Sequence, residues 1–305
     1  MKVNFLFNLK LKSSRFFLTL VATALLMVTT LRSPAVAATA KHYDQLTFPP
    51  LPEIQIPEYT RYQLENGMTV YLVEDHELPL VEGTALFRTG SRFEPDDKVG
   101  LASLTGEVMR TGGTQSHPPD ELNQLLEQKA ASIESGVGET SGSAGFSALT
   151  EDLSEVFELF AEVVQDPSFT EDKLELAKTQ RQGSIARRND DPNGIAGREF
   201  QKLIYGPESP YARTIEYVTL DNIQQPDLIN FYQQYFHPEN MILGIVGDFD
   251  PEKMKLMIAN QFGSWKPERQ ATTPPIPEPS QANNGGVFFV SHPQLNQSYI
   301  QMGHM

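Results

Sequence analysis

The order of strand-like and helix-like segments constrains the fold of this chain more than any other feature of its sequence. Apolar and polar residues alternate over 61–73 around an Asn66-Gly67 turn, which predicts a hairpin, and a third strand is predicted at 81–88. The later patterns predict helices at 122–133, 153–164, 170–185, 221–236 and 254–262, and strand structure at 132–149 and 241–246. Strands and helices mixed in this way predict an α+β fold, with an antiparallel-rich sheet packed against helices.

Two proline-rich segments, 38–57 and 269–285, bound this predicted domain, which therefore spans residues 58–268. Because proline disrupts regular structure, we expect the first segment to be an extended tether and the second a linker. Two strand-like stretches follow the linker, at 286–290 and 297–303. Two strands alone do not form a stable unit, so residues 286–305 are expected to be the start of a second domain that is cut short.

The first 37 residues have the pattern of a secretory signal peptide. A basic start at 2–15 precedes an apolar run at 16–31, and Ala35-Val36-Ala37 offers small residues to a signal peptidase. The run is shorter than the roughly 20 residues of a spanning helix, so cleavage and no stable membrane span are predicted. The absence of cysteine excludes disulfides and a lipid-attached cysteine. We expect an exported protein of the periplasm or an equivalent compartment.

Acidic residues outnumber basic ones, and this balance excludes several classes of partner. The 39 Asp and Glu against 24 Lys and Arg give a net charge of −15, and loss of the first 37 residues, with five basic and no acidic residues, would make it −20. Such a charge argues against nucleic acid and anionic membranes. No two of the six histidines are three or four residues apart, so no helix presents a histidine pair. Without cysteine or a G-x-S-x-G motif, nucleophilic hydrolase chemistry has no support.

The chain contains short motifs at Leu64–Val70, Thr89–Arg92, Asp166–Phe169 and Asp190-Asp191-Pro192. Their order resembles that found in the insulinase/pitrilysin family of metallopeptidases. Leu64–Val70 resembles the opening hairpin of the family, and Thr89–Arg92 resembles the turn before its first zinc helix. Asp166–Phe169 resembles the step between two helices, and Asp190-Asp191-Pro192 ends a long helix as it does in relatives. Further blocks resemble the family, at 205–211, 231–240 and 246–249. Members pair two α+β halves around a chamber for extended peptides, so the resemblance implies this architecture.

The segment 99–114 resembles the first zinc helix of that family, but the chemistry of its metal site is missing. In the family, a G-L-A-H-x-x-E-H segment supplies two histidine ligands and the catalytic glutamate, and a glutamate about 75 residues further on is the third ligand. Gly100-Leu101-Ala102 match this pattern. The ligand and catalytic positions carry other residues: Ser103, Gly106, Glu107, and Gly183 or Ser184. The resemblance therefore implies no catalytic residue, no metal and no other cofactor.

The function that this resemblance implies is that of a non-catalytic subunit. It would complete the chamber of a zinc-bearing relative and help to bind extended or unfolded peptides. Zinc needs three protein ligands, which Glu107 alone cannot supply. Two alternatives stay open: an assembly scaffold without proteolysis, and an active zinc endopeptidase with unconventional ligands. The only conceivable cluster for such a metal joins His117 with Glu107 and Glu121, and the simpler expectation places these side chains separately on the surface.

Overall fold

The computed structural model describes residues 49–51, 53, 57–267, 269–271, 275–283, 285–293 and 297–304. The predicted signal peptide, residues 1–37, and most of the predicted tether lie outside these residues. All the helices and strands described below belong to one unit, Ile56–Met305. In the described part of the chain, no helix is both long and apolar enough to cross a membrane.

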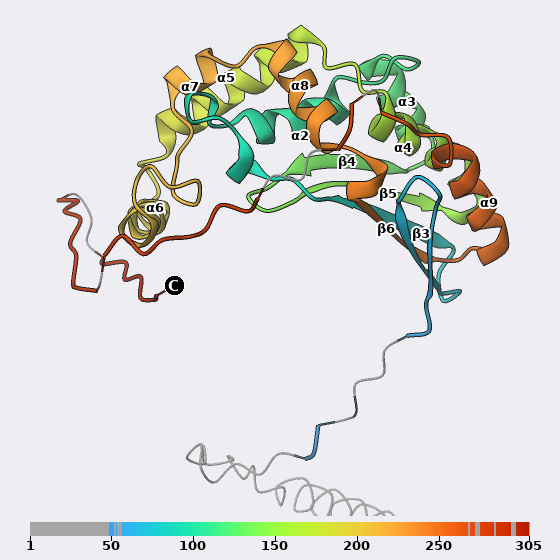
Figure 1. Ribbon diagram of the computed structural model, residues 1–305, viewed down its shortest axis with the longest axis horizontal. Coiled ribbons are helices and arrows are strands. Elements are labelled where there is room, and N and C mark those ends of the chain that lie inside the picture. The colour runs from blue at the N-terminus through green and yellow to red at the C-terminus, as the bar shows by residue number, and fades with distance from the viewer. Residues whose placement is uncertain are drawn as a thin grey trace, which may run out of the picture. The chain divides into compact units, whose positions relative to one another are not determined.

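A six-stranded sheet forms the base of this unit, in the order β1-β2-β6-β3-β5-β4 (Figure 1). The strands are β1 (Thr60–Gln63), β2 (Thr69–Glu74), β3 (Leu80–Phe87), β4 (Ser132–Val137), β5 (Gly142–Leu149) and β6 (Met241–Gly247). Only β2 and β6 run parallel, and every other neighbouring pair is antiparallel. The Asn66-Gly67 turn joins β1 to β2, with Gly67 at a φ of 91° that favours glycine. The predicted α+β fold is confirmed.

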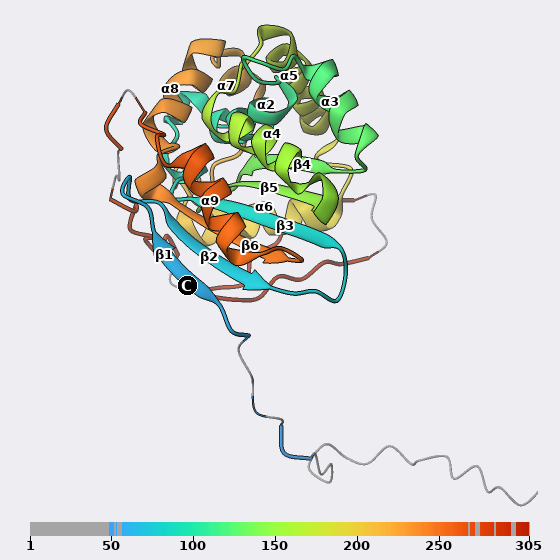
Figure 2. The same ribbon diagram turned by 90° about the vertical axis from the view of Figure 1, so that its right-hand side faces the viewer.

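Helices α2, α4 and α8 lie on one face of the sheet, as Figures 1 and 2 show, whereas α6 lies apart from this layer, at the left of Figure 1. The helices are α2 (Leu101–Thr111), α3 (Pro119–Gln128), α4 (Leu153–Gln165), α5 (Glu171–Arg187), α6 (Pro192–Tyr205), α7 (Tyr217–Asp221), α8 (Gln225–Tyr235) and α9 (Pro251–Phe262). Short 3-10 turns lie at Ser91–Phe93, Asp96–Lys98, Thr150–Asp152 and Pro238–Asn240.

The core lies between the sheet and this helical layer. Along β3, Val81, Ala85 and Phe87 point into it, whereas Leu80 and Leu86 lie on the opposite, open face. This alternation follows from the two-residue period of a strand. A cluster of phenylalanines from β5, α4 and α9 fills the centre: Phe146, Phe157, Phe160 and Phe262. The sheet and its helices therefore share one apolar interior.

Three segments within residues 58–268 differ from the sequence-based expectations. The predicted helix over 122–133 ends at Gln128, because Ala130 takes a positive φ of 48° and Ile133 already belongs to β4. The predicted strand structure over 132–149 is a hairpin of two strands, β4 and β5. Helix α6 was not predicted. The sequence signals for its start are Pro192 in the first turn and Asp191, whose carboxylate accepts hydrogen bonds from the backbone N–H groups of Asn193 and Gly194.

The segment after the predicted linker forms no strand in the described ranges 285–293 and 297–304. Its apolar side chains, among them Phe289 and Ile300, are exposed to solvent. The predicted linker donates hydrogen bonds to α6, from Ala282 N to Ile204 O and from Asn283 Nδ2 to Leu203 O. The division into a domain at 58–268, a linker and a second domain stays a prediction.

Candidate functional site

Helix α2 carries Ser103, Gly106 and Glu107, which the resemblance aligns with a zinc site, and a buried glutamate fixes where the helix begins. Glu94 accepts hydrogen bonds from Gly100 N at 3.0 Å and from Ala102 N at 2.9 Å, through its two carboxylate oxygens. These N–H groups belong to the helix start, where no backbone acceptor is available. Burial raises the pKa of Glu94 above its usual range, although the two N–H donors act in the opposite direction. The carboxylate therefore anchors α2 at an electrostatic cost.

The first ligand position of α2 holds a hydroxyl that serves the helix itself. Ser103 Oγ donates a hydrogen bond to Gly100 O, one turn earlier, at 3.0 Å. Two residues further on, Thr105 Oγ1 donates a hydrogen bond to Leu101 O at 2.8 Å. Both side chains therefore satisfy carbonyl groups within their own helix.

The catalytic position of α2 has no space for a side chain. A Cβ built on Gly106 would lie 2.4 Å from Val137 N and 2.5 Å from Gly136 C, both in the backbone of β4. Ser135 Oγ also donates a hydrogen bond to Gly106 O at 2.6 Å, which draws the strand onto the helix. Glycine at 106 therefore permits a close approach of α2 and β4, and a glutamate there would force them apart.

The second ligand position of α2 pairs with an arginine of α5. Glu107 Oε2 lies 2.7 Å from the guanidinium Nη2 of Arg181. The two side chains are 27% and 37% exposed, so water screens their attraction and the pair contributes less than about 1 kcal/mol to stability. The pair nevertheless gives the only acidic residue among the missing ligand positions a cationic partner from the chain itself.

The predicted positions of the third ligand do not meet Glu107. Ser184 is exposed and its Oγ donates to Gln180 O at 3.1 Å. The nearest atoms to a Cβ on Gly183 would be the guanidinium nitrogens of Arg187, at 3.7 Å and 3.8 Å. Sequence reasoning missed Arg181, although it lies on the same helical face as the buried Leu174 and Ala177. That face is the one that α5 turns towards the protein interior.

The conceivable cluster of His117, Glu107 and Glu121 does not form. His117 Nδ1 lies 2.7 Å from Glu162 Oε2 on α4, and Thr114 Oγ1 donates to the same carboxylate oxygen at 2.9 Å. Within the described ranges, no group of three histidine or acidic side chains is placed to hold a metal ion. His117 therefore ties the loop after α2 to α4.

A second histidine bridges two acids at one end of the sheet. His76 Nδ1 lies 2.5 Å from Asp248 Oδ1, and its Nε2 lies 2.7 Å from Glu74 Oε1. The hydrogen bond to Asp248, followed by the one to Glu74, raises the pKa of His76. The hydrogen bond between His76 and Asp248 also lowers the pKa of Asp248. Both ring nitrogens face carboxylate oxygens, which can only accept, so the geometry favours the protonated imidazolium over the neutral ring.

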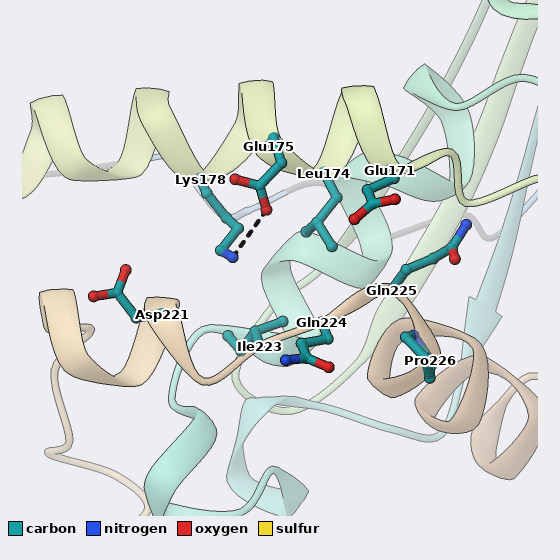
Figure 3. Close-up of a pocket in the computed structure, with 9 residues that line it drawn as sticks. All are labelled: Glu171, Leu174, Glu175, Lys178, Asp221, Ile223, Gln224, Gln225 and Pro226. Carbon is teal, nitrogen blue, oxygen red and sulfur yellow. Dashed lines mark hydrogen bonds and ion pairs between the residues drawn. The ribbon is translucent and has the colours of Figure 1, made fainter.

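A pocket of about 340 Å³ lies between α5 and the loop that joins α7 to α8 (Figure 3). Its walls carry acidic and amide groups, and Lys178 pairs with Glu175 at 3.0 Å across one helical turn. The residues around it are Glu171, Leu174, Glu175, Lys178, Asp221, Ile223, Gln224, Gln225 and Pro226. None of the degenerate motif positions lines this pocket, so it is separate from the missing metal site.

Comparison with known proteins identifies relatives of the whole described unit. The family described as Insulinase (Peptidase family M16) matches residues 70–202, and Peptidase M16 inactive domain matches residues 222–304. An uncharacterized zinc protease of Mycobacterium leprae is 23% identical over 249 residues, which cover 80% of this chain and 55% of that protein. The non-peptidase homolog YmxG of Helicobacter pylori is 24% identical over 254 residues, covering 82% and 57%. The chain spans about half the length of the curated relatives it matches.

A solved structure supports the same relationship at the level of the fold. The peptidase M16 inactive domain from Pseudomonas fluorescens superposes with a TM-score of 0.67 at 24% identity, over 73% of this chain and 54% of that chain. It shares the mixed sheet packed against helices. With the ordered motifs and both matching domains, these findings show that this chain belongs to the insulinase family of peptidases, peptidase family M16.

Proposed function

We propose that this chain is a non-catalytic subunit that completes the peptide-binding chamber of a zinc-bearing member of its family. The observation that carries the proposal is the state of α2: the helix keeps its place against the sheet, but Gly106 is closed off by β4 and Glu107 is paired with Arg181. A catalytic zinc site needs three protein ligands and a position for water. Peptide-bond hydrolysis therefore has to come from a partner.

The role of the chain in this complex is to bind extended or unfolded peptides. Strand β4 is the last strand of the sheet and lies beside α2, so its outer edge is the place for an added peptide strand. Such a strand is held through backbone hydrogen bonds, which do not depend on the peptide sequence. A chamber that this chain completes with a partner must accept unfolded peptides of varied sequence, and this requires binding through the peptide backbone.

Co-expression with a relative that has an intact H-x-x-E-H motif tests the proposal. We expect the two chains to co-purify and the complex to cleave an unfolded peptide faster than the zinc-bearing chain alone. The variant Ser103→Ala should leave the activity of the complex unchanged, because its hydroxyl bonds only within α2. A complex no more active than the zinc-bearing chain would contradict a role in substrate binding.

An assembly scaffold without proteolysis is the second candidate function. The similarity to a protein named non-peptidase homolog favours it. A stable complex that contains no peptidase would support this candidate. The third candidate function is that of an active zinc endopeptidase. It requires the purified protein to contain stoichiometric zinc and Glu107→Gln to lose it. The ion pair between Glu107 and Arg181 argues against this function.

We also propose that the chain is exported, because residues 1–37 have the pattern of a cleaved signal peptide. The mature protein should begin at Ala38, the residue after Ala35-Val36-Ala37. N-terminal sequencing of the protein purified from its native cells measures this directly. A chain recovered from those cells with Met1 still attached would contradict export through this signal.

A further inference from the structure

The main-chain groups on the outer edge of β4 can be assigned from its pairing with β5. Gly138 N donates to Ser141 O at 2.9 Å in the turn between the strands. In an antiparallel pair, hydrogen-bonded and non-hydrogen-bonded positions alternate. The pairs Gly136–Ser143 and Glu134–Gly145 are therefore the hydrogen-bonded ones. The residues that alternate with these pairs are Ile133, Ser135 and Val137. Their N–H and C=O groups point away from β5.

An arginine of α2 already occupies part of this edge. Arg110 Nε donates a hydrogen bond to Ile133 O at 2.8 Å, and Arg110 Nη2 donates to Asn123 Oδ1 of α3 at 2.9 Å. Burial lowers the pKa of Arg110, but a guanidinium stays charged in proteins. The side chain thus lies across the strand edge with a fixed orientation, held at one end by the strand and at the other by α3.

Helix α2 restricts the same edge at its other end. A Cβ built on Gly106 would lie 2.4 Å from Val137 N, so α2 lies against the strand edge at Val137. Ser135 lies between this contact and the contact made by Arg110. An incoming strand would have to donate to Ile133 O from the outer side of β4, where the guanidinium of Arg110 already lies.

We propose that Arg110 gates the edge of β4: its guanidinium must leave Ile133 O before an extended peptide can add to the strand. This inference rests on the proposed function, because it concerns the regulation of the same peptide site. When a peptide adds, its N–H replaces Arg110 as the donor to Ile133 O. The peptide therefore gains little free energy at this position, because the chain gives up a hydrogen bond from a charged donor. The gate therefore weakens peptide binding by about tenfold.

Fluorescence anisotropy with a labelled peptide of alternating threonine and valine, blocked at both ends, tests the gate. In Arg110→Met the side chain keeps its apolar length but has no donor, and we expect it to bind the peptide about tenfold more tightly than the wild type. Asn123→Ala removes only the second anchor of the guanidinium and should give an intermediate affinity. Arg61→Met, the same change on the opposite edge strand β1, should leave the affinity unchanged.

The outcomes separate the gate from the proposed function. Equal binding by the wild type and Arg110→Met would overturn the gate and leave peptide addition standing. Binding by neither protein would overturn both. Binding by Arg110→Met alone would support the gate in its strongest form. If circular dichroism shows that Arg110→Met is unfolded, Asn123→Ala decides, because a wild-type affinity in that variant contradicts the gate. A peptide N-methylated at every residue should not bind, since neither of its edges can donate hydrogen bonds to β4.

Discussion

Replacement of Gly106 by alanine should lower the free energy of unfolding by about 2 kcal/mol. The new Cβ would meet backbone atoms of β4 at 2.4 Å and 2.5 Å, which flexible side-chain movement cannot relieve, so the strand must move away from α2. Overpacking of this kind costs up to about 3 kcal/mol. The better helix propensity of alanine offsets about 1 kcal/mol of that cost. Urea denaturation followed by circular dichroism measures the difference.

Gly183→Ala is the matched control, because it makes the same change inside another helix. A Cβ at 183 would have no neighbour closer than 3.7 Å, and that neighbour is the mobile end of Arg187. We expect this variant to be more stable than the wild type by about 0.5–1 kcal/mol. Similar effects of the two substitutions would mean that α2 and β4 do not approach as closely as described.

Restoration of the family motif is expected to fail for the same reason. The triple variant Ser103→His, Gly106→Glu, Glu107→His should be destabilised more than Gly106→Ala, because the longer side chain occupies the same closed space. It should also show no peptidase activity, since Gly183 and Ser184 still supply no third ligand. Measured hydrolysis of an unfolded peptide by the purified triple variant would contradict this account.

Removal of the Glu94 carboxylate is the second substitution with a large expected effect. In Glu94→Ala the N–H groups of Gly100 and Ala102 lose a charged acceptor in a buried position. We expect the free energy of unfolding to fall by about 3 kcal/mol, since hydrogen bonds to charged groups contribute about 1.5–3 kcal/mol each. The control is Glu158→Ala, on the exposed face of α4, which should change the free energy of unfolding by less than about 0.5 kcal/mol.

The pH dependence of Glu94→Gln gives an independent check. Because burial raises the folded-state pKa of Glu94, the unfolded chain releases this proton at a lower pH than the folded chain does. The wild type therefore gains stability from this group as pH falls through the raised pKa towards the ordinary value of 4.5. Glutamine does not titrate, so the stability deficit of Glu94→Gln should widen between neutral pH and pH of about 5. If the stability deficit of Glu94→Gln narrows as the pH falls, the folded-state pKa of Glu94 is lowered and not raised.

The α+β fold could be predicted from the sequence because its strands alternate and its main helices bury one apolar face. The turn at Asn66-Gly67 and the stripe of α4 are signals of this kind. Helix α6 was not predicted although Ala196, Phe200 and Leu203 recur at helical spacing, because Gly194 and Gly197 in its first turns argue against a helix. Near Ala130 the helical spacing of apolar residues continues into a strand, and only the left-handed backbone there marks the end of α3.

The candidate site could be predicted only in part. Ser103, Gly106 and Glu107 follow from the resemblance, since they align with a contiguous motif. Arg181 does not, because its contact with Glu107 joins two helices across 74 residues of sequence. Gly183 lies only two residues from Arg181, but two residues turn an α-helix by about 200°, so the two positions face opposite sides. The closeness of β4 to Gly106 also depends on packing that local patterns do not encode.

The ion pair between Glu107 and Arg181 has a consequence for how this protein reaches its working form. In a metallopeptidase, the ligands of one helix and those of a distant helix are joined through an ion that the cell must deliver. Here the positive charge is a side chain synthesised with the rest of the polypeptide. For the non-catalytic subunit that we propose, the junction of α2 and α5 therefore closes as the chain folds, without waiting for a metal ion.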